Sequence, residues 1–305
     1  MSATSVTARR DPTPPDLSIT PRNVRFARGR AQDRWWLGGD PIGSAYHNAL
    51  SITFPRGEAY FVESVKAFRD GTPEKLAREI RAFSVQEVMH SREHLAFNNR
   101  VAEAGYRVDH LEQAVIDSLA KTAGRPRILD LAVTMALEHY TATMAHEILK
   151  RPDVFAGADP ELANLWRWHA IEEIEHKGVA FDTWMHATRD WARGKRWRVK
   201  AIMMLIVTKN FWTARVAATL DLLAQDGITG WRAKWGLFRY LMLKPGVVRR
   251  IVPAWAAYFL PGFHPWNEDD RHLIQLAESE YEAALLPGGR LLEVPAEDEV
   301  PLAAE

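Results

Sequence analysis

Apolar side chains recur at helical spacing along most of the chain, and this periodicity predicts an all-α protein. Phe61, Val65 and Phe68, for example, follow one another at intervals of four and three residues and would form one face of a helix. No segment shows the apolar and polar alternation of a half-buried strand, and no internal repeat is visible. The pattern predicts long helices over residues 55–70, 72–105, 127–150 and 159–190, and a short helix over residues 109–121.

Two of the predicted helices begin with clear start signals. The tripeptides TPE, from Thr72, and DPE, from Asp159, each combine a capping side chain, a proline at the first helical position and an acid in the first turn. Short connections join the first long helix to the second and the third to the fourth, so each pair should form an antiparallel hairpin. Together the two hairpins predict a four-helix bundle.

The expected organisation of the chain has four parts. Residues 1–30 contain Arg and Pro but no apolar run typical of a secretory signal, so we expect a disordered N-terminal segment in a cytoplasmic protein. Residues 31–190 should form the bundle. Residues 191–266 predict a basic, Trp-rich helical extension packed on the bundle, and residues 267–305 an acidic C-terminal helix and tail.

Charge is balanced overall but unevenly distributed. The 39 Lys and Arg match 39 Asp and Glu, so nothing global suggests nucleic acid as a partner. Residues 191–250 hold thirteen Lys and Arg against two Asp, whereas residues 267–305 hold eleven Asp and Glu against two Arg. An acidic tail lying near a basic helical layer would explain both segments.

The basic segment has a second interpretation. Trp191, Trp197, Trp231 and Trp235 interleave with Lys and Arg, which suits a helix lying at a membrane surface. The apolar run at residues 201–207 is too short to span a bilayer. We favour helices that pack over the bundle, and we keep peripheral membrane contact as the alternative.

The second predicted helix carries a Glu-x-x-His motif. The stretch 86-QEVMHSREH-94 places Glu87 and His90 on one stripe, with His94 one turn further on. Glu58 lies on the apolar face of the first predicted helix. At 1.5 Å per residue, Glu58 lies roughly 18 Å before the turn between these helices and Glu87 roughly 22 Å after it. The two carboxylates should therefore lie at similar depth.

The fourth predicted helix carries the second Glu-x-x-His motif. In 169-HAIEEIEHKG-178, the directions of His169, Glu173 and His176 fall within about 60° of one another. Glu138 lies on the apolar side of the third predicted helix. It is roughly 21 Å before the end of that helix, and Glu173 is roughly 20 Å after the start of the fourth. The two carboxylates of the second hairpin should therefore also lie at similar depth, as in the first.

These residues form a pattern that is typical of metal proteins. A Glu from each of two helices and a Glu-x-x-His from each of the other two is the ligand arrangement of ferritin-like di-iron and di-manganese bundles. The chain has no cysteine, so any metal must be held by His, Asp and Glu. Oxygen-rich ligation suits Fe/Fe or Fe/Mn, with Zn as an alternative. We expect two divalent ions, held by Glu58, Glu87, His90, Glu138, Glu173 and His176. His94 is a further candidate ligand.

Several segments resemble a bacterial family described as "predicted metal-dependent hydrolase". They are 47-HNALSITFPRGEAYF-61, 87-EVMHSREH-94, 138-EHYTATMAHEIL-149 and 166-WRWHAIEEIEHKG-178. The resemblance runs from about Pro21 to the acidic tail, and it implies a ferritin-like fold and a metal-dependent enzyme. The spacing of His169, Glu173 and His176 is also similar to that of di-iron N-oxygenases that oxidise arylamines. That second similarity covers only the ligand pattern, and it implies His169 as a seventh ligand.

Three functions compete at this stage. The first is an O2-activating oxidase or oxygenase acting on a small or apolar organic substrate. The second is a metal-dependent hydrolase, in which paired metals lower the pKa of a bridging water. The third is a non-catalytic metal-binding protein. The carboxylate-rich ligand set favours the first, and the residues that follow the bundle would enclose a substrate. We also expect a homodimer, and the sequence identifies no catalytic residue beyond the metal ligands.

Overall fold

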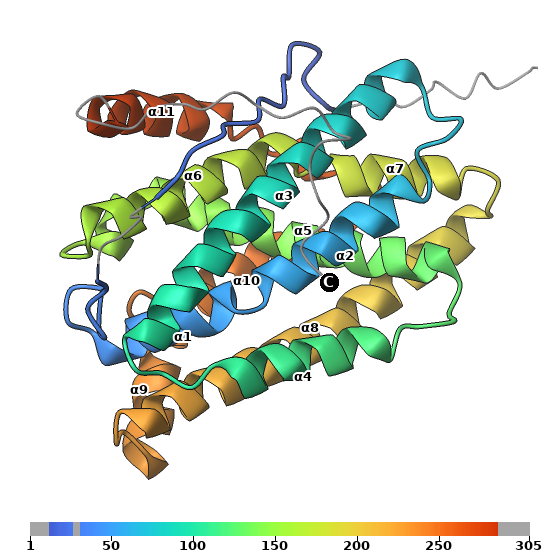
Figure 1. Cartoon of the computed structure of the whole chain (residues 1–305). Coiled ribbons are helices and arrows are strands. Elements are labelled where there is room, and N and C mark those ends of the chain that lie inside the picture. The colour runs from blue at the N-terminus through green and yellow to red at the C-terminus, as the bar shows by residue number, and fades with distance from the viewer. Residues whose placement is uncertain (1–11, 27–30, 286–305) are drawn as a thin grey trace, which may run out of the picture.

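The computed structural model describes residues 12–26 and 31–285, which form eleven α-helices and no β-strand within those ranges (Figure 1). Four long helices form the centre of the molecule: α2 (Phe54–Lys66), α3 (Glu74–Glu103), α5 (Arg127–Lys150) and α6 (Pro160–His176). Helix α2 packs on α3 and α5 packs on α6, while contacts of α2 with α5 and of α3 with α6 close the arrangement. The predicted all-α class is confirmed.

The two hairpins form where turn and capping residues predict them. Gly71 adopts the left-handed conformation, with φ of 77°, in the turn between α2 and α3. Asp159 caps α6 by accepting hydrogen bonds from the backbone N–H groups of Glu161 and Leu162. Thr72 does not cap α3 as expected. Its hydroxyl donates to the Arg69 carbonyl instead, and the helix begins at Glu74.

The predicted helix over residues 159–190 is divided in two. Helix α6 ends at His176, and α7 (Val179–Ala187) follows a short break. Trp266 packs against this break so closely that a Cβ atom at Gly178 would lie 3.0 Å from the indole ring. The ammonium group of Lys177 donates to the Asp270 carboxylate at 2.7 Å. The break is therefore stabilised by a segment about 90 residues later in the chain, which local periodicity cannot reveal.

Residues 12–26 correct the expectation of a disordered segment over residues 1–30. They lie along the bundle, where Val24 and Phe26 are buried in the main core (Figure 1). The Phe26 N–H donates to the Glu93 carboxylate at 3.0 Å. Burial of these apolar side chains offsets the entropy lost in ordering the segment. The rest of that expectation, residues 1–11 and 27–30, lies outside the described part of the chain.

Further helices cover the bundle. They are α1 (Pro41–Ser51), α4 (Asp109–Ala120), α8 (Arg193–Gln225), α9 (Gly230–Met242), α10 (Val247–Ala257) and α11 (Arg271–Leu285), with 3-10 turns at Pro152–Phe155 and Pro265–Asn267. Helix α8 packs on α1 and α5, and α10 packs on α5 and α9.

The acidic helix α11 does not pair with the basic layer in the expected way. It packs on α6 and α5, at the opposite edge of the molecule from α9 (Figure 1). Its Glu278 instead accepts a hydrogen bond from Arg22 at 2.6 Å. The tail beyond residue 285 lies outside the described residues. None of the described helices combines the length and apolar character needed to cross a bilayer.

Candidate metal centre

The seven predicted ligands converge at the centre of the four-helix arrangement. Each is less than 5% exposed to solvent, so the cluster is isolated from bulk water. Helices α2 and α5 supply one Glu each, α3 supplies Glu and His, and α6 supplies Glu and two His. The residues that meet there are Glu58, Glu87, His90, Glu138, His169, Glu173 and His176.

The donor atoms fall into three overlapping groups, each with its atoms within 4.8 Å of one another. Glu87 belongs to two of the groups, and so does His90. Overlap of this kind is expected when two ions lie side by side and share carboxylates. The groups are Glu58 with His90 and His169, Glu87 with His90 and Glu173, and Glu87 with Glu138 and His176.

Many of the donor atoms are buried without a hydrogen bond. Both carboxylate oxygens of Glu87 and of Glu138 lack one among the described residues, as does Nε2 of His176. Nε2 of His176 lies only 3.1 Å from Oε1 of Glu87, yet neither atom forms a hydrogen bond with a described residue. A buried polar group without a partner costs about 1–3 kcal/mol. The donor set therefore fits a bound cation, which would satisfy these atoms together.

Hydrogen bonds orient two of the imidazoles so that a lone pair faces the cluster. Nε2 of His90 lies 3.0 Å from the Glu172 carboxylate, and it donates because a carboxylate can only accept. Nδ1 of His176 likewise donates to Oε1 of Gln86 at 3.0 Å. Nδ1 of His90 and Nε2 of His176 then carry the lone pairs that point at the carboxylates. Outer partners of this type fix the tautomer of a metal-ligating histidine.

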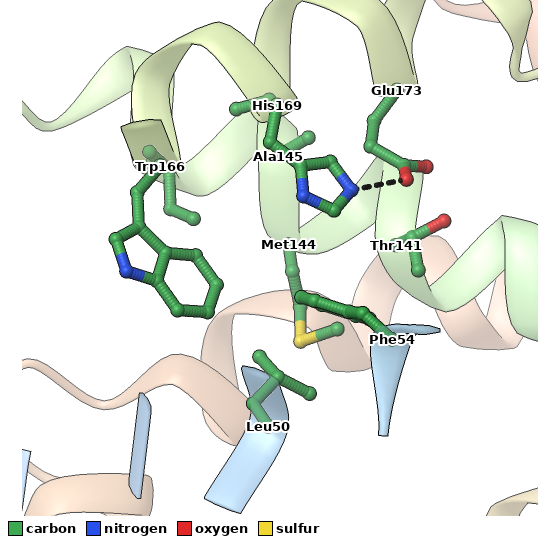
Figure 2. Close-up of a pocket in the computed structure, with 10 residues that line it drawn as sticks. Leu50, Phe54, Thr141, Met144, Ala145, Trp166, His169 and Glu173 are labelled. Carbon is green, nitrogen blue, oxygen red and sulfur yellow. Dashed lines mark hydrogen bonds and ion pairs between the residues drawn. The ribbon is translucent and has the colours of Figure 1, made fainter. Parts of the chain in front are cut away.

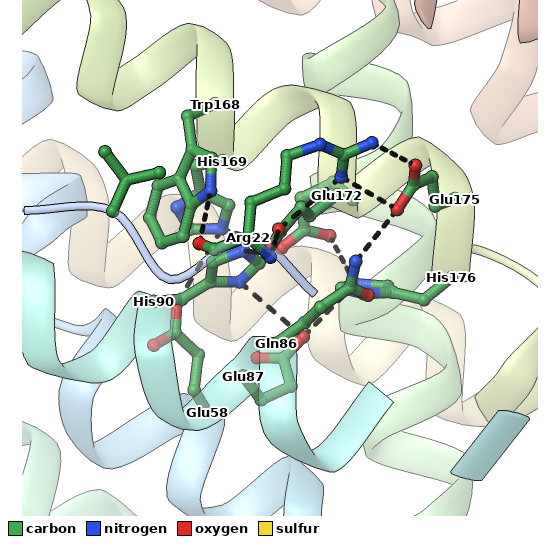
Figure 3. A network of polar contacts seen from close by, with 12 residues as sticks. Arg22, Glu58, Gln86, Glu87, His90, Trp168, His169, Glu172, Glu175 and His176 are labelled. Atoms are coloured by element: carbon green, nitrogen blue, oxygen red, sulfur yellow. Dashed lines mark hydrogen bonds and ion pairs between the residues drawn. The ribbon is translucent and has the colours of Figure 1, made fainter. Parts of the chain in front are cut away.

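The hydrogen bonds that support His90 and those that support His176 both lead to Arg22 (Figure 3). The Arg22 backbone N–H donates to Glu172 at 2.8 Å, and its guanidinium donates to Glu175 at 2.6 Å. Glu175 also accepts from the Gln86 amide at 2.9 Å, which completes the connection to His176. One arginine from the N-terminal segment thus supports two imidazoles of the cluster. Burial lowers the pKa of Arg22, but Glu175 and the neighbouring acids outweigh it and raise that pKa.

His94 occupies a supporting position in the structure. Its Nε2 lies 2.7 Å from Nδ1 of His169, its Nδ1 lies 2.8 Å from the Ser51 hydroxyl, and that hydroxyl donates to Asn98. Because the Ser51 hydroxyl gives its only proton to Asn98, it accepts a hydrogen bond from Nδ1 of His94. Nε2 of His94 then accepts from Nδ1 of His169. Nε2 of His169 is then the lone-pair nitrogen, 2.8 Å from Glu173 and 3.8 Å from Glu58. His94 joins none of the three donor groups.

Burial and mutual repulsion set the protonation of the cluster. Burial raises the pKa values of Glu58, Glu87 and Glu138 well above the usual value, and neighbouring carboxylates add to the rise. Burial also lowers the pKa of His90, with His169 contributing. Burial opposes ionisation of Glu173 as well, but the neighbouring imidazoles of His176 and His169 lower its pKa.

The metal-free protein is expected to become more stable as the pH falls from about 8.5 to about 6.5. The three carboxyls with raised pKa values stabilise the folded state when protonated, and this contribution is lost as the pH rises through those values. His90 and His94, with pKa values lowered from 6.5 mainly by burial, oppose the trend only below that pH. A carboxyl that titrates in this interval contributes on the order of 1 kcal/mol per pH unit.

Thermal unfolding of chelator-treated protein at the two pH values measures this effect. Protein loaded with divalent metal should show the opposite slope, because the ligands must be deprotonated to bind. A metal-free protein that loses stability over the same interval would contradict the protonation states assigned to the carboxyls.

A small cavity adjoins the cluster on the side of His169 and Glu173 (Figure 2). Its volume is about 30 Å³, and its walls are mostly apolar, with Phe54 and Met144 among them. A neighbouring cavity shares three lining residues with it and continues toward Arg151 and Arg250. The shared residues are Leu50, Met144 and Ile148. The cluster is therefore approached through apolar surroundings.

Sequence reasoning missed two of the residues that support the cluster. Gln86 precedes Glu87 in the motif, and only the fold shows that its amide joins His176 to Glu175. Arg22 lies in a segment assumed to be disordered. A signal was present: Glu172 and Glu175 lie on the helix that carries two predicted ligands, and buried acids require a cation nearby.

The fold and the site together define a class of protein: an all-helical protein with a buried, overlapping set of carboxylate and imidazole donors. The chain belongs to the family described as "predicted metal-dependent hydrolase", which it matches over residues 20–269. This finding confirms the family resemblance of the sequence motifs and makes the protein a metalloenzyme by family. No curated protein and no solved structure matches the chain.

Proposed function

We propose that this protein is a hydrolase that uses two divalent metal ions held in a ferritin-like four-helix bundle. The observation that carries the proposal is the set of eight buried donor atoms that form no hydrogen bond within the described part of the chain, all on residues of the predicted ligand pattern. They belong to six residues: Glu58, Glu87, His90, Glu138, Glu173 and His176.

The three donor groups suggest how the ligands would be divided. Glu58, His90 and His169 would hold one ion, and Glu138 with His176 would hold the other. Glu87 and Glu173 lie between the two, in the group that overlaps both sides. Divalent ions in such a site act as Lewis acids and lower the pKa of water. Two ions would also neutralise the four buried carboxylates.

The chain's own residues supply orientation and shielding. The apolar walls around Phe54 and Met144 keep bulk water out of the cavity beside Glu173, whose volume suits one or two water-sized molecules. The hydrogen bonds that join His94 to His169 and to Ser51 hold the His169 imidazole in one tautomer. We infer that a substrate would approach through this cavity and present an apolar group to it.

Oxygen activation is the second candidate. Four carboxylates and three imidazoles form the kind of ligand set that suits iron or manganese, and this composition favoured an oxidase at the sequence level. The family match favours hydrolysis instead, so we place the oxidase second. Fe/Fe, Fe/Mn and Zn/Zn loading remain alternatives for the ion pair, since all use such donors.

Activity assays on metal-reconstituted protein distinguish the two candidates. Metal-stripped protein would be reloaded with Zn²⁺, Mn²⁺ or, without oxygen, Fe²⁺, and assayed with chromogenic carboxylic and phosphoric esters and for oxygen uptake. We expect ester hydrolysis that depends on metal and falls at least about a hundredfold in Glu138→Ala. Glu74→Ala, which removes an exposed carboxylate from α3, is the matched control. Oxygen uptake by the iron form without metal-dependent hydrolysis would reverse the order of the candidates.

A further inference from the structure

Three aromatic side chains form a stacked row on the outer face of α9. Trp231 is 74% exposed, Trp235 44% and Phe238 46%, although large apolar side chains are normally buried. Neighbouring rings are nearly parallel, with centroids 5.8 Å apart for Trp231 and Trp235 and 5.4 Å apart for Trp235 and Phe238. We call these three residues the aromatic row.

Basic side chains flank the aromatic row on both sides. At about 100° per residue, the three rings span about 60° of the helix surface, with Lys234 beside one edge and Arg239 and Arg232 beyond the other. All three basic residues are exposed, and none forms an ion pair within the described part of the chain. Residues 227–263 contain six Lys and Arg and no acid. The surface is therefore both apolar and positively charged.

The opposite face of α9 is fixed to the protein. Ala233, Leu237 and Tyr240 are buried there, and the helix packs on α1, α8 and α10. At Gly236 the helix comes so near to Ile42 that a Cβ atom would lie 2.9 Å from its side chain. The aromatic row therefore faces outward on an anchored helix, as Figure 1 shows for the position of α9 at one end of the molecule.

From these observations we propose that α9 docks this protein onto the surface of an anionic lipid membrane. Trp and Phe side chains partition into the boundary between headgroups and acyl chains, while flanking Lys and Arg reach the negative headgroups. A helix with apolar side chains on one stripe and basic side chains on both edges suits that boundary. Interaction with the surface requires no membrane-spanning helix, in agreement with the described structure.

Two other partners fit the surface less well. A symmetric dimer through α9 would bring Arg232, Lys234 and Arg239 of one copy against the same residues of the other. Nucleic acid binding would need free ring faces on which bases could stack. Here Trp235 is stacked against Trp231 and Phe238, so the row offers bases fewer free faces than three separate rings would. Neither objection applies to a lipid surface.

Cosedimentation of the full chain with lipid vesicles tests the proposal. The vesicles would contain phosphatidylcholine alone, or phosphatidylcholine with about one quarter phosphatidylglycerol, and the expected result is binding to the anionic vesicles that weakens with salt. Replacing Arg232, Lys234 and Arg239 with Ala should weaken binding about a hundredfold, at about one kcal/mol for each cation. Trp231→Ala with Trp235→Ala should also abolish most of the binding.

Leu276→Ala is the matched control, because Leu276 is a 55% exposed apolar residue on α11, away from α9. Circular dichroism of each variant checks folding, and light scattering checks for self-association. Absence of binding to anionic vesicles at low salt would overturn the proposal. So would loss of dimers in the Trp variants without any vesicle binding, which would assign the surface to a second copy. Both results are independent of the metal centre.

Discussion

Replacing Glu87 with alanine is expected to leave the purified protein without the two ions proposed above, with affinity for divalent ions reduced by at least about a hundredfold. Glu87 belongs to two of the three donor groups, and both of its carboxylate oxygens are buried without a hydrogen bond to any residue that the structure describes. No other described residue can take its place, because each of the remaining carboxylates of the cluster belongs to only one of the three donor groups. The loss should therefore affect both ions rather than one.

The fold should survive this substitution. In the metal-free protein Glu87 is a buried acid surrounded by other acids, and removing it relieves repulsion and desolvation. We expect metal-free Glu87→Ala to unfold at the same temperature as metal-free wild type or higher. Elemental analysis gives the metal content, calorimetry gives the unfolding temperature, and Glu74→Ala on the same helix is the control. A variant that retains two ions per chain would contradict the ligand assignment.

Replacing Arg22 with alanine is expected to lower stability by about 3–5 kcal/mol, because it leaves buried acids without their cation. The side chains of Glu172 and Glu175 are 0% and 5% exposed, so water cannot replace the guanidinium. The same change should weaken metal binding by about 10–100-fold, since it removes the guanidinium contacts to Glu172, the partner of His90, and to Glu175, which holds the Gln86 partner of His176.

Two comparisons make this prediction specific to the buried acids. Adding Glu172→Gln and Glu175→Gln to Arg22→Ala should recover much of the stability, because no uncompensated charge is left. Arg271→Ala is the control, since Arg271 pairs with Asp269 near the surface. Denaturant unfolding measures the free energies, and metal titration measures the affinities. A change below about 0.5 kcal/mol in Arg22→Ala would show that the acids are satisfied without it.

The fold was predictable from sequence where the signals are local. Helix α5 spans Arg127–Lys150, the range that apolar spacing and a following proline predict. The division of α6 from α7 was not predictable, because it depends on Trp266 packing against Gly178. The same is true of residues 12–26, whose order comes from contacts with helices far away in the chain.

The candidate site divides in the same way. Glu87 and His90, like Glu173 and His176, are three residues apart on one helix, so helical geometry alone brings each pair together. Placing the two pairs opposite each other required only equal depth in two hairpins. The supporting bonds are different, because Arg22 lies about 150 residues before the acids that it contacts. No spacing rule connects such residues, although the need of buried acids for a cation could have prompted the search.

The central claim is that the donor cluster holds two metal ions. Anomalous X-ray diffraction from crystals of metal-loaded protein tests it most directly, because it locates each ion without relying on activity. We predict two adjacent peaks inside the bundle, one beside His90 and His169 and the other beside Glu138 and His176. A single peak, or peaks only at the protein surface, would contradict the dinuclear centre.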